Sequence, residues 1–98
     1  MGVNIKVDHS RFEKTAKAIE EYKKLVRDKT MQMDTTIKQV GPAFGGKDGI
    51  EFMKQWNQLL AKDSAYDKML KLLQSYADFL RYAAQEYKAA QKRALDRI

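Results

Sequence analysis

Few side chains in this 98-residue sequence could take part in catalysis or hold a metal ion. His9 is the single histidine and cysteine is absent, so transition-metal sites and histidine-paired nucleophiles lack their usual residues. Asp63 and Asp67 have the spacing of one helix face, but two carboxylates placed so are more often solvated than catalytic. We therefore expect no catalytic residue, no metal site and no cofactor, and a protein that is not an enzyme.

The stretch GPAFGGKDG, residues 41–49, holds four of the five glycines and the only proline. Its lysine follows a glycine, but the Ser or Thr of a phosphate-binding loop is missing, and no strand precedes the stretch. The first glycine and the proline instead favour the end of a helix at Val40. The two glycines after Phe44 allow a tight backbone turn. We predict a turn over residues 41–47.

Apolar residues at alternating spacings of three and four predict a long helix on each side of this turn. The first helix is expected at about residues 8–40 and the second at about 48–95. Two helices joined by a short turn fold back antiparallel, which makes the predicted fold class all-α, a helical hairpin. The positions expected in the core or in a dimer interface are Phe12, Ile19, Val26, Met33, Ile37, Phe52, Trp56, Leu59, Tyr66, Leu70, Leu73 and Leu80.

Several side chains are candidates for capping these helices. Asp8 and Ser10 are alternative N-caps of the first helix. Asp48, followed three residues later by Glu51, resembles a capping box at the start of the second helix, although an earlier start remains open. On the exposed surface of the first helix, Glu20 is expected to pair with the lysine four residues on.

Asp63 falls on the apolar seam of the second helix. Either the helix kinks there or that layer is wet, and Ser64 could cap a restarted helix. We expect the helix to be continuous or mildly bent.

A second apolar row flanks the seam of the second helix. Two helices packed along one seam leave this row uncovered, because each helix buries only one stripe. A partner hairpin would cover it and complete a four-helix bundle. We therefore expect one domain over residues 1–98 that pairs as a homodimer or with a related hairpin. The row consists of Met53, Leu60, Met69, Leu72, Tyr76, Phe79 and Ala83.

The net charge of +6 is spread evenly along the chain. Nucleic-acid-binding proteins usually gather their basic residues on one face, so we do not expect nucleic acid as the main partner. A basic helical nucleic-acid-binding protein remains an alternative, and strong salt dependence of binding would identify it. No apolar run in the sequence has the length of a membrane span or the form of a signal-peptide core.

The helical hairpin with an aromatic residue and glycines at its mid-chain bend resembles the WXG family, the small ESAT-like proteins of type VII secretion. In that family, Trp-x-Gly marks the turn between two long helices, and here Phe44-Gly45-Gly46 stands in that place. Phe52, Trp56 and Leu59 fall where members often carry the first core residues of the second helix. The resemblance covers essentially the whole chain.

Tyr82 and Glu86 stand four residues apart near the C-terminus, the spacing of the tyrosine and acid in the family's export signal. The resemblance implies a protein secreted from the cytoplasm without a cleavable signal peptide, in virulence or interbacterial competition. It also implies a helical-hairpin partner and a secretion ATPase that reads the signal. An alternative within this resemblance is a small helical partner of an LXG-type toxin. Phe44 either covers the end of the bundle or stays exposed for docking.

Overall fold

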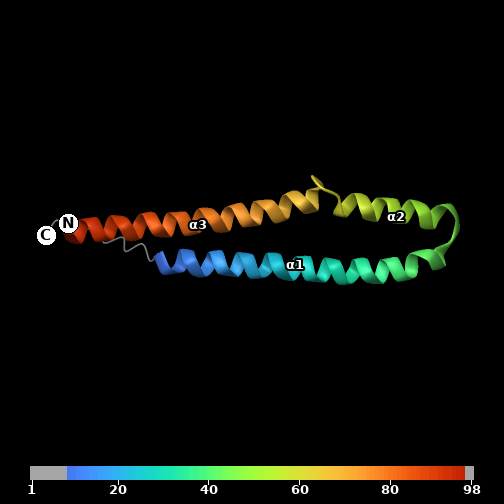
Figure 1. Cartoon of the computed structure of the whole chain (residues 1–98), viewed down its shortest axis with the longest axis horizontal. Coiled ribbons are helices and arrows are strands. Elements are labelled where there is room, and N and C mark those ends of the chain that lie inside the picture. Colours follow the sequence, from blue (N-terminus) through green and yellow to red (C-terminus); the bar gives the residue numbers. More distant parts are fainter. Residues whose placement is uncertain (1–8, 97–98) are drawn as a thin grey trace.

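The computed structural model describes residues 9–96, including their side chains except those of residues 42–44. Figure 1 shows three helices: α1 (His9–Phe44), α2 (Gly46–Leu60) and α3 (Ala65–Asp96). α1 forms one arm, and α2 and α3 follow one another in the second arm, which runs antiparallel to the first. The molecule measures 76 × 21 × 20 Å. The predicted all-α hairpin is confirmed.

The turn between the two arms is shorter than the predicted range 41–47. α1 continues to Phe44 instead of ending at Val40. The fixed φ of Pro42 is compatible with a helix, and the cost of a proline to the preceding turn falls at the very end of α1, which stops two residues later. The chain reverses at Gly45 and Gly46, whose φ angles of 50° and 68° are accessible at little cost only to glycine.

The helix starts agree only in part with the expected caps. α1 begins one residue after Asp8, so the capping position falls on a residue outside the described range, and Ser10 lies inside the helix. α2 begins two residues before Asp48 and has no side-chain cap. The expected capping box of Asp48 and Glu51 is therefore wrong. Asp48 instead lies in the first turn of α2, where its negative charge suits the positive end of the helix dipole.

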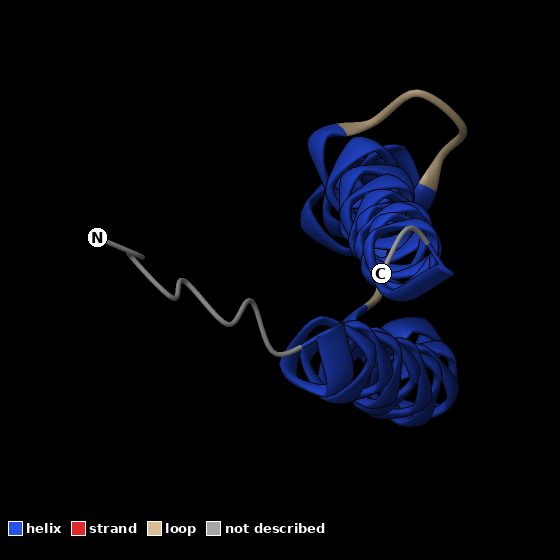
Figure 2. Ribbon diagram, turned by 90° about the vertical axis from the view of Figure 1, so that its left-hand side faces the viewer, coloured by secondary structure: helices blue, strands red, loops and turns tan. Residues whose placement is uncertain are grey.

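The second arm is broken at residues 61–64, so the expectation of one continuous helix is wrong. Asp63 lies in this loop, in the left-handed region with φ 65°, and so shares no helix face with Asp67. Ser64 caps α3, because its Oγ accepts a hydrogen bond from the Asp67 N–H at 3.2 Å. Asp67 Oδ2 in turn accepts from the Asp63 N–H at 2.9 Å. In the end-on view of Figure 2, the loop bulges away from α1.

The core of the hairpin lies between α1 and α3 and is built from small residues. Ala16, Ala77 and Leu80 form a buried cluster, and Phe12 and Ile19 pack against it. Ala16 and Ala77 have no exposed surface. Small residues at these positions let the two helices approach closely.

This core is thin for a chain of its size. Among the described residues, no large side chain is fully buried. The accessible surface is 8163 Å², whereas a globular monomer of this mass exposes about 5,800 Å². A single hairpin therefore leaves much of its apolar surface in contact with water.

Candidate interaction surface

Large apolar side chains lie exposed along one side of both arms. On α3, Leu72, Tyr76 and Phe79 are each more than half exposed, and the rings of Tyr76 and Phe79 stack with centroids 6.5 Å apart. Spacings of three and four residues place such side chains on one helix face. We call this surface the apolar face; its members are Tyr22, Leu25, Met33 and Val40 on α1 and Met69, Leu72, Tyr76 and Phe79 on α3.

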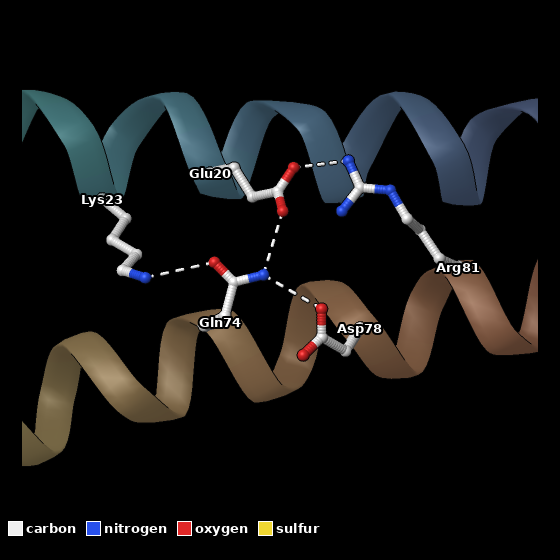
Figure 3. Close-up of polar contacts among 5 residues, drawn as sticks. All are labelled: Glu20, Lys23, Gln74, Asp78 and Arg81. Carbon is white, nitrogen blue, oxygen red and sulfur yellow. Dashed lines mark hydrogen bonds and ion pairs between the residues drawn. The ribbon is translucent and has the colours of Figure 1, made fainter.

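The opposite side of the hairpin is closed by polar contacts between α1 and α3 (Figure 3). Glu20 forms an ion pair with Arg81, and Glu20 Oε2 accepts a hydrogen bond from Gln74 Nε2 at 2.9 Å. Glu20, Gln74 and Arg81 are each two positions along the chain from a member of the apolar face. Two positions correspond to a rotation of about 200° around the helix axis, so these side chains point to the opposite side. The two sides of the hairpin are thus chemically distinct.

Gln74 lies at the centre of this polar side (Figure 3). Its amide oxygen accepts from Lys23 Nζ at 3.1 Å, and its amide nitrogen donates to both Glu20 and Asp78, each at 2.9 Å. The contacts of Gln74 with Lys23 and Glu20 join residues more than fifty positions apart in the sequence, whereas Asp78 lies one turn away on α3 itself. Because they connect particular residues across the arms, they favour one alignment of α3 along α1. Glu20 therefore pairs across the hairpin with Arg81, and not with Lys24 as expected.

The free energy of unfolding should depend on pH through the contact between Glu20 and Arg81. Hydrogen bonds from Arg81 and Gln74 lower the pKa of Glu20 from 4.5 to about 2. A lowered carboxyl pKa stabilises the folded state above pH 4.5, and this contribution is lost as the pH falls towards 2. We expect Arg81→Met to cost stability at pH 6 and to cost less at pH 2.

Urea unfolding of wild type and Arg81→Met at several pH values measures this difference. Asp34 and Asp67, whose pKa values are also lowered, are present in both proteins and cancel in the difference. A difference in stability that stays constant from pH 6 to pH 2 would show that Arg81 does not act through the Glu20 carboxylate.

A buried tryptophan connects α2 to α1. Trp56 is only 9% exposed, and its Nε1–H donates to Asp34 Oδ1 at 2.8 Å. The other Asp34 oxygen lies 2.8 Å from Lys38 Nζ. The hydrogen bonds from Lys38 and Trp56 lower the pKa of Asp34, so this buried carboxylate stays charged and satisfied. Trp56 was expected at a core or dimer interface; its partner Asp34 was not anticipated.

The structure separates the predicted core or interface positions into two groups. Trp56 and Leu80 are buried and belong to the hairpin itself. Met33, Phe52 and Leu59 are about half exposed, so the prediction that they lie in the core of the single hairpin is wrong. Their place in a dimer interface stays a prediction. The remaining positions, all partly buried, are Phe12, Ile19, Val26, Ile37, Tyr66, Leu70 and Leu73.

The two candidate recognition elements lie far apart on the single hairpin. Phe44, Gly45 and Gly46 are at the turn, and the Phe44 side chain lies outside the described residues. Tyr82 and Glu86 are near the other end, one turn apart on α3. Tyr82 is 60% exposed and Glu86 is also exposed, and within the described part of the chain neither side chain has a hydrogen-bond partner. Both are accessible to another molecule.

The described residues offer no metal-binding cluster, since no three His, Cys, Asp or Glu side chains come together there. Within residues 9–96, no helix combines the length and apolar character needed to cross a membrane. The exposed apolar and charged groups of the described surface suit association with another molecule.

Together, the fold and these surfaces define a small α-helical hairpin with one uncovered apolar face and a glycine-containing turn. The chain belongs to the WXG100 family, described as proteins of 100 residues with WXG, whose family model matches residues 4–92. Neither a curated protein nor a solved structure matches the chain. Members of this family are small helical proteins associated with type VII secretion, and they typically form dimers of helical hairpins. Family members are secreted and are not known as enzymes.

Proposed function

We propose that this chain is a secreted protein or targeting partner of a type VII system, acting as a single domain through a helical dimer and a C-terminal export signal. The uncovered apolar face supports pairing with a second hairpin, because covering it would remove its exposed aromatic and aliphatic side chains from water. The second hairpin is another copy or a related chain, including the helical domain of an LXG-type toxin. In this role the protein leaves the cytoplasm without a cleavable signal peptide.

The observation that carries the export proposal is the accessible pair Tyr82 and Glu86 on α3. A side chain and its neighbour one turn away present one continuous surface, so an aromatic ring and a carboxylate could be read together. The aromatic–glycine turn of a partner hairpin would lie beside this pair in an antiparallel dimer. The secretion ATPase would then read both elements at once.

Export of single variants tests this proposal. We expect Tyr82→Ala and Glu86→Ala each to reduce the fraction of protein found in the culture supernatant about tenfold or more, as expected when an interface hot spot is lost. Both side chains are exposed, so helicity and unfolding should match the wild type. Immunoblots of supernatant and cell fractions from a type VII host measure the effect.

Gln85→Ala is the matched control, because Gln85 is exposed on the same turn of α3 but stands outside the Tyr–Glu pair. It should be exported like the wild type. Normal export of both the Tyr82 and the Glu86 variants would show that the pair is not the signal.

A further inference from the structure

A groove opens on the polar side of the hairpin, where the second arm breaks between α2 and α3. Its apolar floor includes Met31 of α1, Leu60 at the end of α2 and Leu70 of α3. The groove lies beside the break at residues 61–64, since Leu60 before the loop and Tyr66 after it both line the groove. The side chain of Met31 is 60% exposed, so part of the floor is open to solvent.

The rim of this groove is mainly basic. Lys23 and Arg27 line it from α1 and Lys71 from α3, against a single carboxylate, Asp67. Asp67 accepts from the Asp63 N–H and lies 3.0 Å from Lys71 Nζ, and Asp63 Oδ1 lies 3.8 Å from the same nitrogen, so Lys71 is already paired. Lys23 donates a hydrogen bond to the neutral amide of Gln74, and its charge also acts on the nearby Glu20 carboxylate. Among its lining residues the groove therefore combines an apolar floor with a net positive charge, of which Arg27 carries the unpaired part.

Arg27 has the most available charge on this rim. It is exposed, and within the described part of the chain it forms no ion pair or hydrogen bond. A guanidinium group without a partner can bind a carboxylate through two parallel hydrogen bonds. Arg27 stands beside Met31, one helical turn away, so a single ligand segment can reach the charge and the apolar floor together.

The groove also stays open when the apolar face is covered. Lys23 and Gln74 line it and belong to the polar contacts of Figure 3, on the opposite side from Tyr22 and Tyr76. A hairpin packed on the apolar face therefore leaves these residues accessible. A ligand at the groove would be a third component, beyond the proposed dimer.

We propose that this groove docks an acidic amphipathic segment of a partner protein. Carboxylates of the segment lie on Arg27, Lys23 and Lys71, and its apolar side chains pack on Met31 and Leu60. Opposite charge on rim and ligand steers association and selects acidic segments over neutral ones of the same shape.

The probe is a short fluorescent peptide designed as an amphipathic helix, with leucines on one face and glutamates beside them. Its matched control carries glutamine at every glutamate. Fluorescence anisotropy with the full-length protein should show that the acidic peptide binds at least about tenfold more tightly than the glutamine peptide, and less tightly as salt rises.

Arg27→Glu should lower the affinity for the acidic peptide about tenfold, because charge reversal turns attraction into repulsion. Lys17→Glu is the matched control: Lys17 is exposed on the same helix, does not line the groove and should bind the peptide like the wild type. Helicity spectra check that both variants fold.

Backbone amide shifts on peptide binding locate the site, and they should gather around Met31, Leu60 and Leu70. Failure of the acidic peptide to bind, equal binding of the glutamine peptide, or shifts gathered around Tyr76 and Phe79 would each overturn the proposal. Competition of duplex DNA with the peptide in the wild type, but not in Arg27→Glu, would assign the groove to phosphate binding. That result would also overturn the proposal. None of these outcomes depends on export, so the proposed function is tested separately.

Discussion

Replacing Trp56 with alanine is expected to lower the free energy of unfolding by about 3–5 kcal/mol, the usual cost of removing a buried tryptophan. Trp56 is the only large buried side chain among the described residues of α2. Its loss leaves a cavity between α2 and α1 and also removes the donor to the buried Asp34 carboxylate. A small domain has a total stability of about 5–15 kcal/mol, so α2 should separate from α1 in this variant.

Urea unfolding followed by far-ultraviolet circular dichroism, at one fixed protein concentration, measures the loss. Trp56→Phe is the control, because it keeps a ring in the site and removes only the Nε1–H and part of the volume. It should cost clearly less than alanine. If alanine were tolerated with a loss below about 1 kcal/mol, the packing of α2 on α1 through Trp56 would be wrong.

Replacing Ala77 with leucine is expected to lower the free energy of unfolding by about 1–3 kcal/mol, and more if the helices cannot move apart. Ala77 has no exposed surface and clusters with Ala16 on the facing helix. A leucine there must either push α3 away from α1 or take an unfavourable rotamer. Displacing α3 would also stretch the ion pair between Glu20 and Arg81.

Ala90→Leu is the matched control for this substitution. Ala90 is exposed on the same helix, and alanine and leucine have similar helix propensities, so its effect should stay within about 0.5 kcal/mol. Thermal and urea unfolding of both variants give the comparison. Equal stability of the two leucine variants would mean that α1 and α3 do not approach closely at Ala77.

The hairpin and its turn could be predicted because their causes are local. Apolar periodicity marks the two arms, and consecutive glycines mark the reversal at Gly45 and Gly46. The end of α1 was misplaced because proline disfavours a helix interior but has a φ that is itself helical, so the helix can run on for two residues past Pro42. Local signals therefore predicted the two arms and the reversal between them, with an error of four residues at the end of α1, but not the division of the second arm into α2 and α3.

The facing residues of α1 were harder to predict, because a heptad pattern and a straight helix have different periods. A pattern repeating every 3.5 residues drifts by about 20° per heptad relative to a straight helix of 3.6 residues per turn. Far along α1, the heptad pattern therefore assigns Met33 to the face towards the second arm, whereas in the structure Asp34 lies on that face. Met33 is 54% exposed and Asp34 only 7%. Following the 3.6-residue period would have placed Asp34, and not Met33, on the face towards the second arm.

The polar contacts across the arms could not be predicted from spacing within one helix. Glu20 has a lysine four residues on, but its carboxylate binds Arg81, which lies sixty-one positions away. Which of two cations a carboxylate selects depends on the alignment of the arms, and that alignment is set by packing of the whole hairpin. Ser64 was recognisable from the sequence as a possible N-cap of a new helix after a break. In the structure it does cap α3.

The break at 61–64 divides the second arm into parts that need not open together. α3 is held along α1 by the alanine-rich core and the Glu20 contacts, whereas α2 is held chiefly by Trp56. Because no helical hydrogen bonds run continuously from α2 to α3, fraying of one is not passed to the other through the backbone. The amide protons of α2 should therefore exchange with solvent as a separate unit of lower protection, while those of α1 and α3 exchange together.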